Sequence, residues 1–518
     1  MANLSTGFQG CIPDTFSNVT LFGAQIQAIN ANPVTGYSYP VLDGWRYSQP
    51  SVPVENATFC NVTVTYTHPG QNDSITAEVW LPLEDSWNGR LQAIGGGGWV
   101  AGRFVLSYAG MAGAIVDGYA TASTDAGLSS DSSLVDWGLA SPGNLNLVAL
   151  DNFGQRSLGS HHQTGIEDYY GRPVDYSYWN ACSNGGRQAG VLAQQYPDAY
   201  NGIIAAAPGL YWTELAVSSV WPAVFMDVTK QYPRNCELNQ LTTLAIAECD
   251  GLDGVKDGLI ANPEECRATF SPWDHVGTRF TCSDTNATMA ISTAAASVAE
   301  ATWDGPKYSN GDFMWYGYEI GVDLSTAART TCGTNGTCVP AGRVTSVFWY
   351  LEYVLRDLTA NVTSLTHAQY DQLYLAMKRA FAGSVQAAEP RISGFQQAGG
   401  KMITYHGLAD TSITPNSTLH YYQEVSHALP NITDFYRYYR VPGLGHCWGG
   451  NGGQPVHLFD QLRQWVENGT APEASPVTVT LPTNETMAEV LCPWPKQAVL
   501  VQDPHGDFAN TTDSWLCR

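Results

Sequence analysis

The stretch Tyr176-Ser-Tyr-Trp-Asn-Ala-Cys-Ser-Asn-Gly-Gly-Arg-Gln188 predicts a buried strand, a tight turn of small residues and the beginning of a helix. A serine can occupy the strained turn between a strand and a helix when the residues two positions before and after it are small. Around Ser183 those residues are Ala181 and Gly185, so the pattern is A-x-S-x-G rather than G-x-S-x-G. The stretch therefore predicts a nucleophile elbow. The alternative is a serine that only caps a helix.

Short apolar runs followed by glycine-rich turns and helix-like stretches recur on both sides of this elbow. Strands that alternate with helices at this spacing indicate βαβ units and a parallel sheet. The alternation stops at about residue 209 and resumes at about 399; between these positions lie aromatic clusters and cysteines. We predict one α/β domain made of residues 1–208 and 399–518, interrupted by an inserted domain at 209–398.

Two further loops contain the residues that would complete a catalytic triad. Asp410 follows a predicted strand, and His446 lies 36 residues later in a glycine-rich loop. The order Ser, Asp, His is the one found in α/β-hydrolases. His446 would accept the proton of Ser183 as a general base, and Asp410 would orient the imidazole. Asp125 is a rival acid, but it precedes the serine. His406 is a competing histidine four residues before Asp410, and it could be only a residue at the end of a strand.

An oxyanion hole needs two backbone N–H donors, one of them from the residue after the nucleophile. Asn184 is that residue. Gly97 and Gly98, in a run of four glycines at an earlier strand end, are the predicted second source, because glycine lets the backbone approach a substrate closely. The glycine run lacks the G-x-G-x-x-G context of a phosphate-binding loop.

Cys182 precedes the predicted nucleophile and Cys447 follows the predicted base. If Ser183 and His446 share a hydrogen bond, the two cysteines come close enough for a disulfide, which requires Cα atoms within about 7 Å. None of the twelve cysteines forms a CxxC pair, which favours a disulfide framework. Four further pairings are hypotheses, the last by elimination: Cys11–Cys60, Cys492–Cys517, Cys332–Cys338 and Cys236–Cys282.

Composition excludes several classes of partner. Lys and Arg number 24 against 47 Asp and Glu, for a net charge of -23, which leaves no basic surface for nucleic acid or an anionic membrane. No run of about 18 apolar residues is present to span a membrane. Thirteen N-x-Ser/Thr sequons accompany the even number of cysteines, although some arise by chance in a chain rich in Asn, Ser and Thr. Together they predict a secreted glycoprotein.

The residues Cys182-Ser183, Asp410 and His446-Cys447 resemble the CS-D-HC signature of the tannase and feruloyl esterase family, and the similarity extends over the whole chain. The resemblance implies an α/β-hydrolase fold with a lid inserted between the serine and the acid, and a secreted serine esterase of the feruloyl esterase B type. The implied substrates are phenolic esters or feruloylated polysaccharides. Tannase is the nearest alternative, and a non-catalytic secreted glycoprotein that binds phenolics or sugars is a remote one.

An acidic loop in the insertion contains three aspartates within eight residues, at positions 250, 253 and 257. Such a loop supplies the oxygen ligands that hard cations prefer, but Val255 replaces the side-chain ligand of a true EF-hand. The alternative is an acidic surface turn. The resemblance implies a structural Ca²⁺ ion held by Asp250, Asp253 and Asp257 with the carbonyl groups of Val255 and Leu259, in a loop closed by Cys249 and Cys266.

Aromatic residues of the insertion are candidates for stacking on a phenolic ring. The predicted set is Trp212, Phe225, Phe348 and Trp349. For each of them the alternative is a place in the core of the insertion itself. The sequence allows a monomer or a homodimer.

Overall fold

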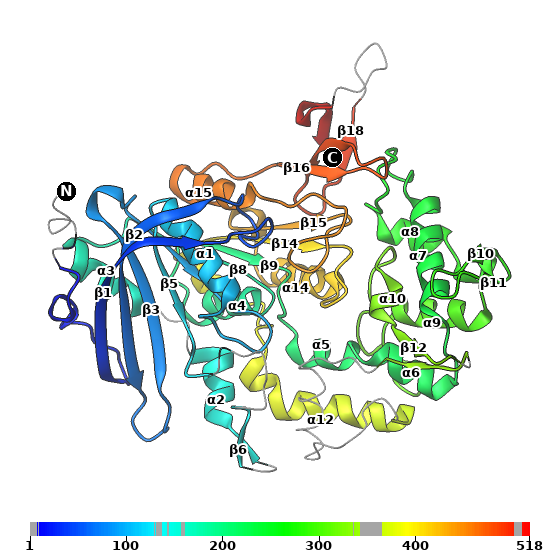
Figure 1. Ribbon diagram of the computed structural model, residues 1–518, viewed down its shortest axis with the longest axis horizontal. Helices are drawn as coiled ribbons and strands as arrows, with labels where there is room; N and C mark the ends of the chain where they lie inside the picture. Colours follow the sequence, from blue (N-terminus) through cyan, green and yellow to red (C-terminus); the bar gives the residue numbers. More distant parts are fainter. Residues whose placement is uncertain are drawn as a thin grey trace.

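A nine-stranded sheet forms the centre of the computed structural model, which describes residues 8, 10–128, 130, 137–141, 144–156, 161–334, 336–341, 365–501 and 510–518. The strand order is β1-β2-β3-β5-β4-β8-β9-β14-β15 (Figure 1). The strands are β1 (Gln25–Tyr39), β2 (Val54–Thr67), β3 (Ile75–Pro82), β4 (Arg90–Ile94), β5 (Ala120–Thr124), β8 (Tyr176–Cys182), β9 (Gly202–Ala206), β14 (Lys401–Gly407) and β15 (Tyr436–Val441).

The sheet has an antiparallel and a parallel part. β1, β2, β3 and β5 pair antiparallel in that order. From β5 through β4, β8, β9 and β14 to β15 every pairing is parallel, which confirms the predicted parallel sheet. Helices α1 (Val105–Val116), α4 (Asn184–Gln195) and α14 (Pro415–Ala428) lie in the connections between parallel strands. All parallel strands thus end at the same edge, where ligand sites of such sheets form.

Helices cover both faces of the parallel part, because successive side chains of a strand point to opposite faces. On β14, Ile403 and Tyr405 pack in one cluster with Leu458 and Trp465 of α15 (Leu458–Asn468). Met402 belongs to the opposite cluster, which contains apolar residues of α4 and α14. The site at the sheet edge therefore rests on a core that is closed on both sides.

Between β5 and β8 the described residues form five short elements. They are β6 (Leu139–Ser141), β7 (Asn144–Leu145), α2 (Leu147–Asp151), the π-helical turn η4 (Asn152–Arg156) and α3 (His161–Tyr170). Side chains of this segment, including Trp137 and Phe153, pack against the aromatic residues of the following insertion.

The described residues between 209 and 398 contribute no strand to the central sheet. They form α5 (Trp212–Ser218), α6 (Trp221–Thr229), α7 (Asn235–Cys249), α8 (Pro263–Thr269), α9 (Thr293–Asp304), α10 (Leu324–Ala327), α12 (His367–Val385), α13 (Ser393–Gln397) and the hairpins β10 (Arg279–Thr281)–β11 (Thr288–Ala290) and β12 (Thr330–Cys332)–β13 (Cys338–Pro340). In Figure 1 helices α7 to α10 (green) lie beside the sheet, at the opposite end from β1 and β2. The boundaries of the inserted domain stay a prediction.

Two small hairpins follow α15 at the C-terminal end. They are β16 (Ser475–Thr480)–β17 (Thr486–Leu491) and β18 (Ala498–Leu500)–β19 (Trp515–Cys517). Val255, in the acidic loop of the insertion, packs in one apolar cluster with Val490, Cys492 and Trp515. The acidic loop is therefore in contact with the end of the chain.

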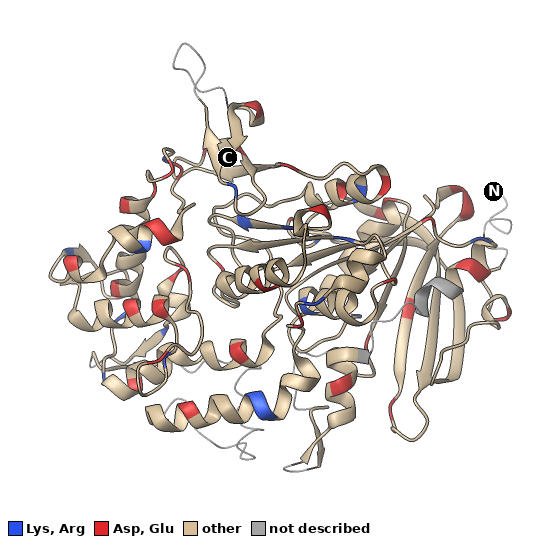
Figure 2. Ribbon diagram, turned by 180° about the vertical axis from the view of Figure 1, so that it is seen from behind, with Lys and Arg blue, Asp and Glu red and all other residues tan. Residues whose placement is uncertain are grey.

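The twelve cysteines form six disulfides, and none is free. The pairs are Cys11–Cys60, Cys182–Cys447, Cys236–Cys282, Cys249–Cys266, Cys332–Cys338 and Cys492–Cys517. The predicted disulfide framework is thereby confirmed. No helix in the described ranges combines the length and the apolar composition needed to cross a bilayer. Acidic residues are distributed over the whole molecule, with few Lys and Arg between them (Figure 2).

Candidate active site

Ser183 follows the last residue of β8 and precedes the first residue of α4. Its backbone has φ 63° and ψ -120°, a region that non-glycine residues rarely occupy and that the surrounding structure must maintain. The Ser183 N–H donates to the carbonyl of Ala206 at 3.0 Å, and the Ser183 carbonyl accepts from the N–H of Arg187 at 2.9 Å. The neighbouring strand β9 and helix α4 thus hold the serine in the strained elbow.

The departure from the usual elbow pattern at Ala181 has a steric explanation. A Cβ atom on Gly185 would lie 2.4 Å from the Cβ of Ala181 and 2.8 Å from the carbonyl oxygen of Gly96. The space between positions 181 and 185 therefore holds one methyl group. Because Gly185 has no side chain, Ala181 fits in the place where G-x-S-x-G has its first glycine.

The structure brings the three predicted triad residues together at the carboxyl edge of the sheet. His446 Nε2 lies 2.9 Å from Ser183 Oγ, and His446 Nδ1 lies 2.7 Å from Asp410 Oδ2. Asp410 follows β14 and His446 follows β15, so three strand ends supply the three residues. The Asp410 side chain is fully buried, whereas 25% of the His446 side chain is exposed. The base therefore faces the solvent side, where a substrate can reach the serine.

The electrostatics of this site favour the charges that acyl transfer requires. Burial opposes ionisation of Asp410, but the charge of His446 and hydrogen bonds from His406 and His446 lower its pKa well below the ordinary value. Burial also opposes protonation of His446, but the charge of Asp410 and the hydrogen bond to it raise the pKa of the imidazole. The lowered pKa of Asp410 and the raised pKa of His446 thus favour an ionised carboxylate beside a protonated imidazole, the pair that proton uptake from Ser183 would create.

The predicted oxyanion loop runs beside the elbow. Gly97 and Val100 exchange two backbone hydrogen bonds of 3.1 and 3.0 Å, so the N–H of Gly97 is used inside the turn and that of Gly98 lies outside this pair. The N–H of Asn184 belongs to the first turn of α4, which provides it with no intrahelical acceptor. The oxyanion roles of these three residues stay predictions, and Asn184 and Gly98 fit them best.

Two side chains of α4 hold this loop against the elbow. The Gly96 N–H donates to Gln188 Oε1 at 2.9 Å, and Gln188 Nε2 donates to the carbonyl of Ala101 at 2.9 Å. Asn184 Nδ2 donates to the carbonyl of Val100 at 3.0 Å. The sequence analysis did not identify Gln188 in this role. Its position four residues after Asn184, on the same face of the helix, is the signal that was available.

Arg187 lies fully buried beneath the same loop. Its guanidinium group donates to Asn184 Oδ1 and to the carbonyls of Phe153 and Gly154, each at 2.8 Å. It also lies 4.7 Å from the ring centre of Phe153 and 5.7 Å from that of Trp212. The cation therefore fixes the side chain of Asn184 and joins the elbow helix to η4.

The candidate aromatic substrate contacts lie in different places. Trp212 is only 7% exposed and packs edge-on against Trp99 of the glycine loop, with ring centres 5.1 Å apart. Phe225 is partly buried on α6 beside Trp221. Phe348 and Trp349 lie outside the described residues. Trp212 thus packs against the glycine loop and supports it. The substrate-binding role of these four aromatic residues stays a prediction.

Asp125, the rival acid, is engaged elsewhere. Its Oδ2 accepts from Arg103 Nη1 at 2.9 Å, and its Oδ1 accepts from the N–H groups of Thr76 and Gly127. It follows β5, which lies beyond β4 from the nucleophile strand, whereas β14 and β15 lie on the other side. The strand order therefore separates Asp125 from His446.

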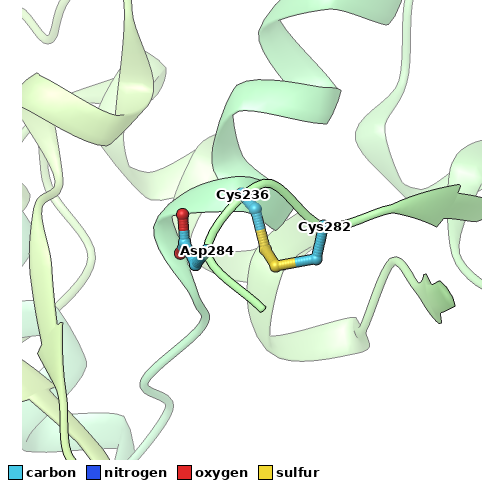
Figure 3. Close-up of side chains that lie close together, drawn as sticks. All are labelled: Cys236, Cys282 and Asp284. Carbon is cyan, nitrogen blue, oxygen red and sulfur yellow. A yellow bond between two sulfur atoms is a disulfide. The ribbon is translucent and has the colours of Figure 1, made fainter. Parts of the chain in front are cut away.

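The described His, Cys, Asp and Glu side chains show where ligand atoms for a metal ion come together. In those residues a single group of three has its ligand atoms within 4.8 Å of one another, namely Cys236, Cys282 and Asp284 (Figure 3). The two cysteines are joined in a disulfide and offer no thiolate, so this group is no metal centre. The three aspartates of the acidic loop do not meet that distance limit.

The aspartates of the acidic loop instead organise the loop backbone. Asp250 Oδ1 accepts from the N–H groups of Asp257 and Gly258 at 2.9 and 2.8 Å. Asp253 Oδ1 accepts from Val255 at 3.0 Å, and Asp257 Oδ1 accepts from Leu259 at 2.8 Å. Glu489 of β17, which the sequence analysis did not identify, lies within hydrogen-bonding reach of Asp257. No Lys or Arg in the described residues forms an ion pair with these four carboxylates.

Comparisons with known proteins agree on one family. Residues 60–515 match the family model described as tannase and feruloyl esterase. A protein named probable feruloyl esterase from Arthroderma benhamiae is 37% identical over 479 residues, which cover 90% of this chain and 87% of that protein. The solved tannin acyl hydrolase from Aspergillus niger has a TM-score of 0.83 at 25% identity and covers 98% of this chain and 93% of its own. Feruloyl esterase B from Aspergillus oryzae has a TM-score of 0.77 at 23% identity, with 99% and 100% covered.

Proposed function

The chain belongs to the tannase and feruloyl esterase family, and we propose that it is a secreted serine esterase that releases hydroxycinnamic acids of the ferulate type from plant cell-wall esters. As a member of this family with an α/β-hydrolase fold, it is a carboxylic ester hydrolase. The proposal depends mainly on two hydrogen bonds of His446. Its Nε2 lies 2.9 Å from Ser183 Oγ, and its Nδ1 lies 2.7 Å from Asp410 Oδ2.

The proposed reaction follows from the positions of these groups. Ser183 Oγ attacks the ester carbonyl while its proton passes to His446 Nε2, and the imidazolium is stabilised by ionised Asp410. The N–H groups of Asn184 and Gly98 stabilise the oxyanion of the tetrahedral intermediate. His446 then gives the proton to the leaving alcohol, which leaves an acyl-serine. A water molecule, deprotonated by His446, hydrolyses this acyl-enzyme and restores Ser183.

We propose ferulate-type acyl groups as the substrate because the relative at 37% identity is named a probable feruloyl esterase. Tannase is the second candidate, supported by the TM-score of 0.83 to the tannin acyl hydrolase. The two reactions use the same triad, so the lining of the acyl pocket decides between them. Aromatic residues of the insertion are proposed to stack on the phenolic ring, with Phe225 the most accessible of the described candidates.

A paired assay tests this proposal. Methyl ferulate is expected to give a higher kcat/KM than methyl gallate, and the opposite order would replace the ferulate assignment by tannase. Ser183→Ala is expected to lower kcat on either ester by at least about 10³-fold with the fold intact, because the nucleophile is lost. A Ser183→Ala variant with the wild-type rate would contradict the triad assignment itself.

We also propose a structural Ca²⁺ ion in the acidic loop, held by Asp250, Asp253 and Asp257 with the carbonyls of Val255 and Leu259. Support comes from a group of buried carboxyl groups whose ionisation is unfavourable without a cation. Burial raises the pKa values of Asp257 and Glu489, and in both the charge of a neighbouring carboxylate raises the pKa further. Oε1 of Glu489 is buried without a hydrogen-bond partner. A divalent cation with oxygen ligands would offset this charge.

We propose that the protein is secreted. Support comes from six disulfides, which persist in oxidising compartments, and from sequons on the surface, where glycans can be attached. In the described sequons the asparagine is half-buried at two positions, Asn61 and Asn416. It is exposed at the others, namely Asn18, Asn56, Asn72, Asn286, Asn431, Asn468, Asn484 and Asn510. Mass spectrometry of the secreted protein tests the second point, with glycans expected on the exposed set.

A further inference from the structure

The carboxylate of Asp410 accepts four hydrogen bonds, only one of which comes from the catalytic base. Oδ1 accepts from the backbone N–H groups of Ser412 and Ile413 at 2.6 and 3.0 Å. Oδ2 lies 2.7 Å from Nδ1 of His446 and 3.0 Å from Nε2 of a second histidine, His406. One carboxylate oxygen is therefore shared by two imidazole rings.

The partners of His406 determine where its proton lies. Nε2 lies 3.0 Å from Asp410 Oδ2 and 3.1 Å from the carbonyl oxygen of Ile413, and both of these atoms are acceptors. Nε2 must therefore carry a hydrogen, whatever the charge of the ring. Nδ1 lies 2.8 Å from the hydroxyl of Thr418 on α14. In the neutral ring Nδ1 accepts the hydrogen of this hydroxyl, so Thr418 stabilises the tautomer that the two acceptors at Nε2 require.

His406 has no access to the substrate. His406, Thr418 and Asp410 each have 0% of their surface exposed. His406 is the sixth residue of β14 and is paired in register with Arg440 of β15. The charged groups linked to it are Asp410, Arg440 at this register position, and the two carboxylates paired with Arg440, namely Glu264 at 2.8 Å and Glu319 at 3.9 Å. Of these, only Asp410 is hydrogen-bonded to His406 in the described residues.

We propose that His406 is a positioning residue of the esterase: its Nε2–H, oriented by Thr418, holds the Asp410 carboxylate so that Oδ2 faces Nδ1 of His446. The inference rests on the proposed function and extends the triad to a series of Ser183, His446, Asp410, His406 and Thr418. The two backbone donors on Oδ1 fix one end of the carboxylate, and His406 fixes the rotation that directs the other end.

Sharing Oδ2 also limits how strongly Asp410 attracts the proton of His446. A carboxylate oxygen that accepts from two donors has less negative charge available to each of them. Without the His406 donor, Oδ2 keeps more of its negative charge. The imidazolium of His446 is then stabilised by this charge, even though the carboxylate is less well aligned with Nδ1. The acid limb of the pH–rate profile, which reports protonation of His446, then moves to higher pH.

Two variants of similar size separate this role from space filling. His406→Gln retains an N–H group at the reach of Nε2, and His406→Leu removes it. With 4-nitrophenyl acetate as substrate, His406→Leu is expected to lower kcat about tenfold, the rate equivalent of one lost hydrogen bond to a charged group, with KM unchanged. Its acid limb is expected to shift to higher pH, and His406→Gln is expected to recover most of the rate.

A matched control lies two residues earlier on the same face of β14. Thr404 is buried and donates to the hydroxyl of Tyr436 at 3.1 Å, far from the carboxylate. Thr404→Val is expected to lower the Tm while leaving kcat at the wild-type value. If His406→Leu does not fold, Thr418→Val decides, because it keeps the imidazole and removes only the hydrogen-bond partner of Nδ1. It is expected to lower kcat and to shift the acid limb in the same direction.

The outcomes that overturn the inference are distinct from failure of the proposed function. A wild-type protein without esterase activity would overturn both. An active enzyme in which His406→Leu keeps the wild-type kcat and acid limb would overturn the inference alone. If His406→Leu and His406→Gln lower kcat equally and leave the acid limb unshifted, His406 has only a packing role. A Thr418→Val variant with wild-type kinetics would lead to the same conclusion.

Discussion

Cys182 and Cys447 form a disulfide across a sequence separation of 265 residues, with their Cα atoms 5.9 Å apart. Cys182 is the neighbour of the nucleophile and Cys447 the neighbour of the base, so the bond joins the end of β8 to the loop after β15. Both cysteines are buried. The covalent link thus limits how far Ser183 and His446 can separate.

The first prediction concerns this disulfide. A Cys182→Ala/Cys447→Ala variant is expected to lose up to about 5 kcal/mol of unfolding free energy, because the open chain regains the entropy of a long loop. It is also expected to lower kcat, because the histidine loop is no longer tied to the elbow. Denaturant unfolding and ester hydrolysis measure the two effects.

The matched control for the disulfide is Cys332→Ala/Cys338→Ala, which opens a loop with a sequence separation of only 6 in the insertion. It is expected to leave kcat unchanged. Equal kcat values for the two double variants would show that the link beside the active site has no catalytic effect.

The second prediction is the pH dependence of hydrolysis. His446 must be neutral to accept the serine proton. Burial opposes protonation of the imidazole, but the charge of Asp410 and the hydrogen bond to it together raise the pKa above the ordinary value of 6.5. A raised pKa means that the imidazole is protonated at higher pH, so kcat/KM is expected to fall with a midpoint above 6.5 as the pH decreases. An acid limb with a midpoint below 6.5 would contradict the stabilisation of imidazolium by Asp410.

The third prediction tests the packing of the elbow. Gly185→Ala would put a methyl group 2.4 Å from the Cβ of Ala181 and 2.8 Å from the carbonyl oxygen of Gly96. The elbow and the glycine loop must then move apart, so kcat is expected to fall by about 10²-fold, as a misplacement of about 1 Å can produce. Steady-state kinetics measure this loss.

Gly383→Ala is the control for the elbow variant. A Cβ atom there would meet nothing within 4 Å, and Gly383 lies inside the helix α12. The variant is expected to keep full activity and to gain about 0.5–1 kcal/mol from the higher helix propensity of alanine. If Gly185→Ala were as active as Gly383→Ala, the tight contact between positions 181 and 185 would have no role in catalysis.

The fourth prediction concerns the proposed Ca²⁺ ion. A chelator is expected to lower the Tm by roughly 5 °C and added Ca²⁺ to restore it, because a ligand that binds only the folded state stabilises it. Asp257→Asn is expected to abolish this response. Asp284→Asn, at the exposed carboxylate beside the Cys236–Cys282 disulfide, is expected to retain it. A Tm that is insensitive to both chelator and Ca²⁺ would return the acidic loop to a plain surface turn.

Sequence patterns predicted the strand–elbow–helix unit and the parallel sheet because these depend on residues close together in the chain. Small residues around Ser183 and the alternation of apolar runs with helical stretches are local signals. The role of Gln188 was missed because it depends on the glycine loop, 92 residues away in the sequence. Trp212 was a candidate for substrate stacking or for the core of the insertion. The sequence could not show that it packs against Trp99, because a solitary aromatic residue gives no sign of what it faces.

The sequence alone determined that a strained serine precedes an acid and a histidine in hydrolase order, because steric limits at a tight turn require particular small residues. Chain order already favoured Asp410 over Asp125, but only the tertiary structure brings Asp410 to His446 and shows that Asp410 is shared with His406. The physical reason is the strand order: β14 and β15 lie on one side of the nucleophile strand and β5 lies on the other. Which carboxylate reaches the base is therefore a property of the sheet, since hydrogen bonding between strands that are distant in sequence fixes these positions.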